Sequence, residues 1–594
     1  MAPPPRRTAW ILFAIALVLF LPGIRWGLPH ATGADRILAW GADEVGTLGP
    51  VAELYSVFLN PQVFNPQYPL FHYFVMALFV VPYLAYLRLT GGLSGLSSEY
   101  PYGLADPASA LATMTLLSRL ASLLMGAGLV VATWKAASLL WGRRAGLLAA
   151  LFTMLAVPVV YYARTSNVDL PALFWTSLGF VVFARALKDG LTPRRGIWLG
   201  VWAAVAVGTK DNSWAFFLAM GLAVTALQLR APGPLAERLK PLWMGMATSA
   251  ALYAFTSGLV FRPSRWRQHV DWVVGAAVSL EYPRTLAGAA GLFAEMVSQI
   301  ASAMGWVGLL AALAGVYLSR RQPRTTWPAL ALIVVPVLTI FPVWFLNIRF
   351  VLPLVWLLGL YAAVAFAEGL DARSVGTRRA TLVVLLASSS WLFVRGLDLT
   401  YQSLRDGRYA MGAWLEQHAA DQTVGYFGSF RKLPPVPASL AWHRLHDVCT
   451  LEEWAGAPDI LVIIPQLQYG LEHEWEITGP TWDAIVDGRL GYERVWRAPD
   501  RGLFTRLPIP FVDPPMQVFA RGDFLATVPE EARRTQRDPA LLAPLEPVLA
   551  PWMRRARGVV WWSRNEHLPH PCGQRDLWDP FGVEPPPPFI HATE

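Results

Sequence analysis

Long apolar runs separated by short polar loops occupy residues 1–400. A helix that crosses a bilayer needs about 20 mostly apolar residues, and eleven runs approach that length. They lie at 9–28, 111–134, 145–162, 170–187, 196–209, 212–229, 241–261, 292–318, 326–346, 350–368 and 379–397. The pattern predicts a polytopic α-helical membrane domain with about eleven transmembrane helices. A mean hydropathy of +0.38 agrees, because soluble domains rarely reach it.

Basic residues gather in short clusters between these runs, and the clusters determine the predicted topology. They are Arg6/Arg7, Lys135/Arg143/Arg144, Lys188/Arg194/Arg195, Arg230/Arg238/Lys240, Arg320/Arg321/Arg324 and Arg373/Arg378/Arg379. Cytoplasmic loops are enriched in Lys and Arg. With an uncleaved first span and a cytoplasmic N-terminus, every cluster is cytoplasmic only if the apolar segment 69–89 does not cross. We predict a juxtamembrane or re-entrant helix there, broken near Pro82; the alternative is an ordinary span with inverted topology downstream.

The chain turns polar after Leu397 and stays so. An amphipathic helix pattern over Gly407–Glu416, followed by apolar runs at 423–427 and 459–464 typical of buried strands, predicts a small extracytoplasmic α/β domain over 401–510. The high proline content of 511–594 predicts an irregular, partly extended segment. The two cysteines, Cys449 and Cys572, form either one disulfide or two free thiols.

This topology places several polar motifs, which are far apart in the sequence, on the external side of the membrane. An adjacent pair of acids lies in a first external loop over 29–110, which also holds a proline-aromatic run at 68–74. Other charged residues stand at the external ends of spans. We predict one extracytoplasmic site formed by Asp43, Glu44, Tyr68, His72, Arg119, Asp169, Lys210 and Arg349.

The acids suit the transfer of a sugar from a polyprenyl phosphate. The phosphate leaves as a stable anion, so a general acid is unnecessary, but a hydroxyl acceptor needs a base. Asp43 fits that role in a single displacement, which inverts the anomeric carbon. Glu44 points elsewhere and could orient the acceptor or bind a loop backbone. The alternative is that both are solvated loop carboxylates or acids in the first turn of a helix.

A departing phosphate needs cations, because charge-assisted contacts to its oxygens are strong. Arg119, Lys210 and Arg349 are the candidates, and the alternative for each is a side chain extended to the lipid headgroups. Asp169 could open a helix or pair with Lys210. No metal site and no definite cofactor are predicted, although a divalent cation stays open. The spacing of His567, His570 and Cys572 matches no zinc pattern.

Seven segments carry a resemblance to a known family. They are Asp43-Glu44, Tyr68–Tyr73, Ser118–Ser122, Leu140–Ala150, Pro158–Asp169, Gly208–Asn212 and Arg349–Pro353. In this order, through most of residues 8–400, they resemble GT-C fold glycosyltransferases of the protein O-mannosyltransferase and aminoarabinose-transferase type, glycosyltransferase family 39.

The resemblance implies eleven to thirteen spans, a polyprenyl-phosphate sugar donor, Asp43 as base, Arg119 near the carrier phosphate and Asp169 in the second external loop. Some relatives place a lysine before the proline-aromatic run, whereas this chain has Asn65-Pro66-Gln67, which argues against an aminoarabinose donor.

The function expected is that of a hexosyl- or pentosyltransferase in the plasma (inner) membrane, with its active site and C-terminal domain outside. Its acceptor would be lipid A, a polysaccharide or a protein Ser/Thr, and nucleic acid is not an expected partner. A transporter or flippase of lipid-linked glycans is the alternative. It is disfavoured because the chain shows no inverted repeat and its polar residues gather at one face. A third hypothesis is a non-catalytic scaffold.

Overall fold

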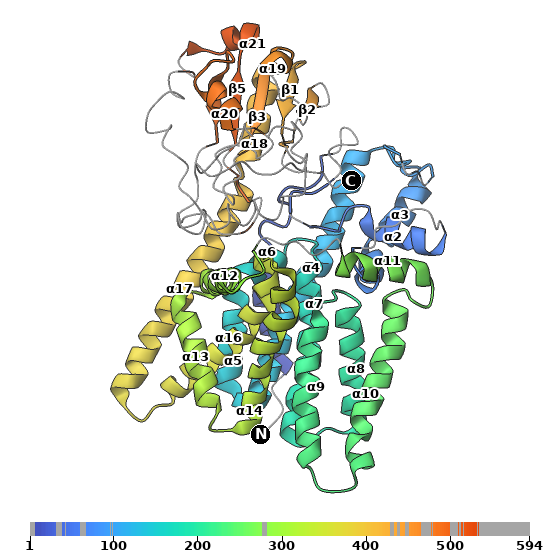
Figure 1. Cartoon of the computed structure of the whole chain (residues 1–594), viewed down its shortest axis with the longest axis vertical. Helices are drawn as coiled ribbons and strands as arrows, with labels where there is room; N and C mark the ends of the chain where they lie inside the picture. Colours follow the sequence, from blue (N-terminus) through green and yellow to red (C-terminus); the bar gives the residue numbers. More distant parts are fainter. Residues whose placement is uncertain are drawn as a thin grey trace.

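The computed structural model describes residues 6–530 and 533. Gaps lie at 31–37, 42, 60–66, 96, 98, 276–281, 428–432, 436–439, 446–450, 465–476, 478, 499–508, 510–511 and 515. The described residues form a helical bundle with a small sheet domain beyond one end of it (Figure 1). This arrangement confirms the predicted fold class.

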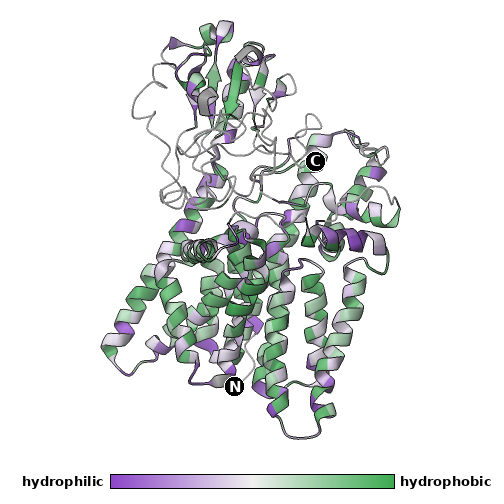
Figure 2. Cartoon of the chain, viewed as in Figure 1, coloured by the Kyte–Doolittle hydropathy of each residue, from purple (hydrophilic) through white to green (hydrophobic). Residues whose placement is uncertain are grey.

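The bundle contains apolar helices of very different lengths. They are α1 (Arg6–Phe20), α4 (Pro107–Trp141), α5 (Arg143–Leu155), α6 (Val157–Tyr162), α7 (Asp169–Asp189), α8 (Pro193–Val207), α9 (Ser213–Arg230), α10 (Leu235–Thr256), α13 (Trp306–Ser319), α14 (Pro323–Thr326), η2 (Trp327–Leu330), α15 (Ala331–Val335), η3 (Pro336–Ile340), η4 (Phe341–Val343), α16 (Ile348–Leu370) and α17 (Val375–Leu404). Figure 2 shows that hydrophobic residues dominate this part of the molecule.

Within the described residues, 8 helices are long and apolar enough to cross a membrane, which is fewer than the eleven expected. The difference arises partly because several expected spans contain shorter helices. The run 145–162, for example, is divided between α5 and α6. The most buried of the long helices is α16, which occupies the centre of the bundle.

The single span predicted over 292–318 is wrong. The chain instead forms α12 (Leu286–Met304) and then α13, with Gly305 between them at φ 77°. Only glycine adopts this backbone conformation readily, so the helix ends there although the sequence stays apolar on both sides. In Figure 1, α12 is seen along its axis, whereas α13 runs along the bundle.

The predicted break near Pro82 is also wrong. Helix α3 (Phe71–Thr90) is continuous and contains Pro82. A proline removes one backbone hydrogen bond, and the apolar residues on either side keep the remaining turns helical. Helix α3 packs against α2 (Gly49–Phe58) and lies with α11 (Pro263–Val274) beyond the ends of α8 and α10 (Figure 1). Its role as a juxtamembrane helix stays a prediction.

Helix α4 is the longest element of the bundle, with 35 residues. At about 1.5 Å per residue it is about 52 Å long, which exceeds the hydrocarbon thickness of about 30 Å. Its first turn is capped by Asp106, which accepts a hydrogen bond from Ser109 N at 3.1 Å. The helix is therefore longer than a bilayer core, and it holds Arg119 beside the loop that follows α1.

The C-terminal domain contains a mixed five-stranded sheet in the order β2-β1-β3-β5-β4. Its elements are α18 (Gly407–His418), β1 (Thr423–Tyr426), β2 (Ala441–Arg444), α19 (Leu451–Ala455), β3 (Ile460–Ile463), α20 (Gly479–Val486), β4 (Glu493–Arg497), β5 (Gln517–Ala520) and α21 (Gly522–Thr527). Strand β1 pairs in parallel with β2 and β3, whereas β5 is antiparallel to β3 and β4.

The amphipathic helix and both strands predicted in this domain are confirmed as α18, β1 and β3. Every residue of β3 is buried, as its uninterrupted apolar run predicts, because apolar clusters cover both faces of the sheet. Cys449, Cys572 and most of the proline-rich segment 511–594 lie outside the described residues.

Candidate active site

Asp43 lies in the loop after α1 and pairs with Arg349 in the first turn of α16. Its φ of 56° is in the left-handed region, which aspartate tolerates better than most residues but at a cost of about 1–3 kcal/mol. The Asp43 side chain is 43% exposed, whereas that of Arg349 is 17% exposed. The pair thus presents a half-exposed carboxylate held by a largely buried cation.

The next residue, Glu44, is turned toward the protein interior. Arg119 donates to both of its carboxylate oxygens, with Nε to Oε2 at 2.9 Å and Nη2 to Oε1 at 2.6 Å. Ser166 donates to Oε2 through its backbone N–H and its hydroxyl, each at 2.9 Å. Two roles were considered for Glu44, and the structure shows the contact that belongs to one of them, binding a loop backbone.

Arg119 is fully buried and holds two parts of one loop together. Besides Glu44, it binds the carbonyl oxygens of Ile24 at 2.8 Å and Trp26 at 2.6 Å through Nη1. The structure therefore places Arg119 beside Glu44 and not among the residues that line the pocket described below. Its contact with a carrier phosphate stays a prediction.

Two glycines allow this loop to pass close to its neighbours. A Cβ added at Gly41 would lie 2.1 Å from Glu44 Oε1, and one at Gly46 would lie 2.3 Å from Ser166 Oγ. Ser118 Oγ donates to the Gly46 carbonyl at 2.8 Å. Larger residues at these two positions would displace the Glu44 carboxylate or the Ser166 loop.

A second ion pair joins Asp169, the first residue of α7, to Lys210 in the loop between α8 and α9. Both side chains are largely buried. The Lys210 ammonium also lies 5.3 Å from the centre of the Phe350 ring. Burial lowers the pKa of Lys210, with Asp169 acting in the opposite direction. The predicted proximity of Asp169 and Lys210 is present in the structure.

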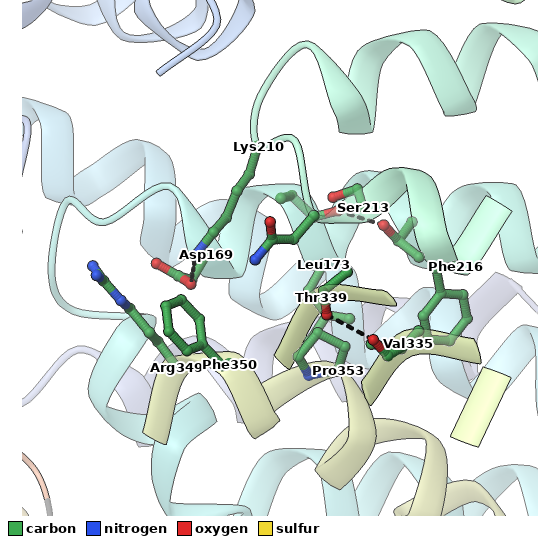
Figure 3. A pocket seen from close by; sticks show the side chains of 13 residues that line it. Asp169, Leu173, Lys210, Ser213, Phe216, Val335, Thr339, Arg349, Phe350 and Pro353 are labelled. Atoms are coloured by element: carbon green, nitrogen blue, oxygen red, sulfur yellow. Dashed lines mark hydrogen bonds and ion pairs between the residues drawn. The ribbon is translucent and has the colours of Figure 1, made fainter. Parts of the chain in front are cut away.

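This ion pair stands at the mouth of a pocket of about 490 Å³, a volume that includes open space. The pocket is lined by Asp169, Ala172, Leu173, Thr176, Lys210, Asn212, Ser213, Phe216, Val335, Thr339, Arg349, Phe350 and Pro353. Figure 3 shows Asp169, Lys210 and Arg349 at one end, with apolar side chains such as Leu173 and Phe216 beyond them. The pocket therefore has a charged mouth, and the rest of its lining combines apolar side chains with polar ones such as Thr176, Ser213 and Thr339.

Two buried polar atoms at this mouth have no hydrogen-bond partner in the part of the chain that the structure describes. They are Asp169 Oδ2 and Arg349 Nε. The opposite wall includes Val335 and Thr339, next to or within the π-helical turn η3. Such turns often occur at functional sites, and unpaired buried polar atoms are rare unless a ligand or water satisfies them.

Tyr68 and His72 are placed differently. The Tyr68 hydroxyl lies in the field of Arg349, Asp43 and Asp169, and burial is the main cause that raises its pKa. Tyr68 therefore stands near the charged groups of this site, although it does not line the pocket. His72 is buried in α3, and among the described residues neither of its ring nitrogens has a hydrogen-bond partner.

The sequence analysis missed a further ion pair, which contacts the backbone of Tyr68. Arg265 in α11 binds Glu53 Oε2 in α2 through Nε at 3.2 Å and through Nη2 at 2.9 Å. Its Nη2 also donates to the Tyr68 carbonyl at 3.1 Å. Neither residue stands beside a recognisable motif, so their only signal was the occurrence of isolated charges in segments that were predicted to be external.

Within the described ranges, no group of three or more His, Cys, Asp or Glu side chains has the geometry to hold a metal ion. The charges at the site are instead arranged as Asp–Arg, Glu–Arg and Asp–Lys pairs. One of these cations, Arg349, takes part both in the Asp43 pair and in the pocket lining.

Comparison with known proteins supports the resemblance seen in the sequence. Residues 113–252 match the family model described as dolichyl-phosphate-mannose-protein mannosyltransferase. The matched segment includes Arg119, Ser166, Asp169 and Lys210. The coarser prediction, a membrane protein similar to glycosyltransferases of this type, is therefore confirmed. A search of curated proteins finds no match.

Several solved structures are distantly similar. An Archaeoglobus fulgidus oligosaccharyltransferase in complex with Zn and sulfate has 12% identity and a TM-score of 0.38, with coverage of 72% of this chain and 62% of that one. ArnT from Cupriavidus metallidurans bound to undecaprenyl phosphate has 15% identity and a TM-score of 0.44, with coverage of 86% and 98%. Arabinofuranosyltransferase AftD from Mycobacteria has 13% identity and a TM-score of 0.34, with coverage of 87% and 42%. The chain thus spans less than two thirds of the first and third of these proteins.

The Glu44 site predicts a loss of stability in acid. Burial alone would raise the pKa of Glu44, but the Arg119 charge and the hydrogen bonds from Arg119 and Ser166 together lower it. A carboxyl with a lowered pKa in the folded state stabilises that state above its unfolded pKa of about 4.3 and loses this contribution as the pH falls. The melting temperature in detergent should therefore fall less between pH 6 and pH 3 for Glu44→Gln than for the wild type. Parallel curves of melting temperature against pH would contradict the prediction.

Proposed function

We propose that the chain is a membrane glycosyltransferase that moves a sugar from a polyprenyl-phosphate donor to an acceptor hydroxyl, with Asp43 as the base. The observation that carries the proposal is the double position of Arg349. Arg349 forms an ion pair with the Asp43 carboxylate, and it also lines the charged mouth of the pocket together with Lys210. A single cation thus connects the group that would activate the acceptor with the groups that would hold the donor phosphate.

The pocket has the chemistry of a lipid phosphate. Its charged end supplies Lys210 and Arg349, and its interior supplies apolar and aromatic side chains between α7, α9 and α16. A phosphate at the mouth would satisfy Arg349 Nε, which is unpaired among the described residues, and the first part of a polyprenyl chain would cover the apolar wall. The match to a mannosyltransferase family described by its dolichyl-phosphate donor supports the same assignment.

An exchange of ion pairs would prepare Asp43 for its role. While Arg349 holds Asp43, the ion pair occupies one of the two carboxylate oxygens. When the donor phosphate enters, it competes for Arg349 and leaves Asp43 free to accept the acceptor proton. The sugar–phosphate bond breaks as the acceptor oxygen bonds to the anomeric carbon, so the carbon is inverted and the phosphate leaves with the electron pair. This displacement needs no cofactor, although a divalent cation could assist the leaving phosphate.

We further propose that this site faces the extracytoplasmic side of the plasma membrane. All the basic clusters between spans would then be cytoplasmic, as the distribution of Lys and Arg predicts. The acceptor would approach the exposed part of the Asp43 carboxylate, whose side chain is 43% exposed. A hydroxyl on a protein, a polysaccharide or a lipid is consistent with a carboxylate base.

The proposal is tested by changing the charge at the pocket mouth. Lys210→Met combined with Asp169→Asn removes the ion pair without leaving either charge buried alone. We expect this variant to bind a polyprenyl phosphate in lipid nanodiscs about 10- to 100-fold more weakly, because one charge-assisted hydrogen bond contributes about 1.5–3 kcal/mol.

The matched control is Lys188→Met, an exposed lysine in the last turn of α7, at the other end of that helix. It should bind the polyprenyl phosphate as the wild type does. Wild-type protein that neither binds polyprenyl phosphates nor transfers a labelled sugar from them to membrane or protein acceptors would refute the proposed function. Movement of the labelled lipid across the bilayer without bond formation would support a flippase instead.

A further inference from the structure

A fully buried ion pair at the start of the C-terminal domain faces the loop that carries Asp43. It consists of Asp406 and Arg408, whose side chains are both 0% exposed. Arg408 donates to Asp406 through Nη2 at 2.7 Å and through Nε at 2.9 Å. Burying two charges is unfavourable unless their other hydrogen-bonding groups are satisfied, so the remaining partners of the pair are informative.

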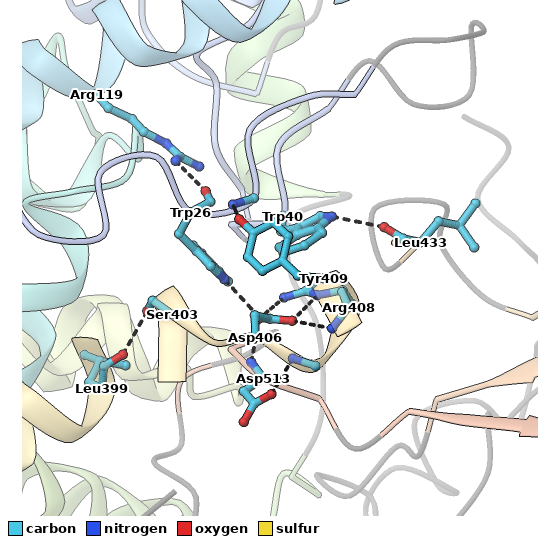
Figure 4. A network of polar contacts seen from close by, with 12 residues as sticks. Trp26, Trp40, Arg119, Leu399, Ser403, Asp406, Arg408, Tyr409, Leu433 and Asp513 are labelled. Carbon is cyan, nitrogen blue, oxygen red and sulfur yellow. Dashed lines mark hydrogen bonds and ion pairs between the residues drawn. The ribbon is translucent and has the colours of Figure 1, made fainter. Parts of the chain in front are cut away.

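Two tryptophans from the loop after α1 are among those partners (Figure 4). Trp26 Nε1 donates to Asp406 Oδ2 at 3.0 Å. The Arg408 guanidinium lies 3.8 Å from the centre of the Trp40 ring, a cation–π contact that burial strengthens. We call Trp26, Trp40, Asp406 and Arg408 the tryptophan clamp.

The loop backbone is fixed at the same place. Trp40 N donates to the Gly27 carbonyl at 2.9 Å, and Gly27 N donates to the Tyr409 hydroxyl at 2.9 Å. A Cβ at Gly27 would lie 2.6 Å from atoms of Trp40, so the two segments touch without space for a larger residue. On the other side of Trp40, its Nε1 donates to the Leu433 carbonyl at 3.1 Å.

Asp43 lies between this clamp and a second fixed point. Trp40 precedes it by three positions, and Glu44, which follows it, is held by Arg119. Arg119 also binds the carbonyl of Trp26, so the two fixed points are connected. Because the Asp43 backbone has a positive φ, its conformation depends on the residues that hold it at either side.

We propose that Asp406 and Arg408 are positioning residues for Asp43, so that the C-terminal domain completes the active site by anchoring Trp26 and Trp40. This inference rests on the proposed role of Asp43 as base. Neither residue of the pair lines the pocket that contains Lys210. Loss of the clamp should therefore impair turnover and leave donor binding intact.

The main test variant is Asp406→Asn combined with Arg408→Met, which removes both buried charges. We expect faster hydrogen exchange of the described loop residues 38–41 and 43–47, a fall in kcat of about 100-fold and a donor KM within about twofold of the wild type, because a displacement near 1 Å can reduce turnover that much. The pH profile of kcat should also shift, since the surroundings of Asp43 change. Arg489→Met, an exposed arginine in the same domain, should change none of these quantities.

A milder variant covers the case in which the double variant does not fold. Tyr409→Phe removes only the hydroxyl that accepts from Gly27 N, and it should raise loop exchange and lower kcat by about tenfold, again without a change in donor KM. Unchanged loop exchange, unchanged kcat, or an equal loss of kcat and donor affinity would each overturn the inference. A wild-type chain without transferase activity would refute the proposed function instead, and loop exchange would then decide whether the clamp holds the loop.

Discussion

Replacing Asp43 by asparagine is expected to lower kcat by about 10²–10⁴-fold, the contribution that a positioned general base usually makes. The amide has the size of the carboxylate but cannot accept the acceptor proton. Donor binding should persist, because Lys210 and Arg349 remain and Arg349 is released from its ion pair with Asp43. Transfer of a labelled sugar from a polyprenyl phosphate, measured together with donor affinity, checks both parts of this prediction.

Asp106→Asn is the matched control for this experiment. Asp106 is exposed in the same segment between α1 and α4 and caps α4, and asparagine caps helices equally well. The control should therefore keep wild-type turnover and stability. An Asp43→Asn enzyme that retained more than about a tenth of wild-type kcat would exclude Asp43 as the base, because a general base contributes at least about 10²-fold.

Replacing Arg119 by methionine is expected to destabilise the protein by about 3–5 kcal/mol, because it leaves the Glu44 carboxylate buried without its cation. The two loop carbonyls at Ile24 and Trp26 would lose their donor as well. Arg119→Lys should not restore stability, since an ammonium cannot reproduce the paired contact with Glu44 and reach both carbonyls. Thermal unfolding in detergent measures the loss.

Adding Glu44→Gln to Arg119→Met should recover part of that stability, because no charge then stays buried. A double-mutant cycle over these two positions isolates their interaction. Arg144→Met is the control: Arg144 forms an exposed pair with Asp371, and such pairs contribute about 0–1 kcal/mol. If Arg119→Met were as stable as this control, Arg119 would not be the residue that holds the loop.

The helical part of the fold was largely predictable, because each crossing of a membrane requires a long apolar run that is visible in the sequence. The errors occurred where a single backbone conformation outweighed hydrophobicity. Gly305 ends α12 within an apolar run, whereas Pro82 does not interrupt α3. In the C-terminal domain, the buried runs predicted β1 and β3, but the antiparallel addition of β4 and β5 depends on contacts between distant segments.

The sequence analysis named several residues of the candidate site and the pairing of Asp169 with Lys210, but it did not predict the pairs Asp43–Arg349 and Glu44–Arg119. Basic clusters and span ends predicted that Asp43, Asp169, Lys210 and Arg349 would lie on one side of the membrane. The partner of Asp43 lies 306 positions away and that of Glu44 lies 75 positions away. The two adjacent carboxylates look alike in the sequence. In the structure, however, Asp43 is half-exposed, whereas Glu44 is buried against Arg119.

The sequence alone predicted the polytopic helical architecture and the small α/β domain. It also provided the residue types that could bind a phosphate and accept a proton. These follow from local properties: apolar length, charge asymmetry and strand periodicity. Only the tertiary structure decided that Arg349 would connect Asp43 with the pocket, that Arg119 would serve Glu44, and that Arg408 would lie against Trp40. Those contacts join segments from 75 to more than 300 positions apart, and their geometry arises only when the helices and the C-terminal domain pack together.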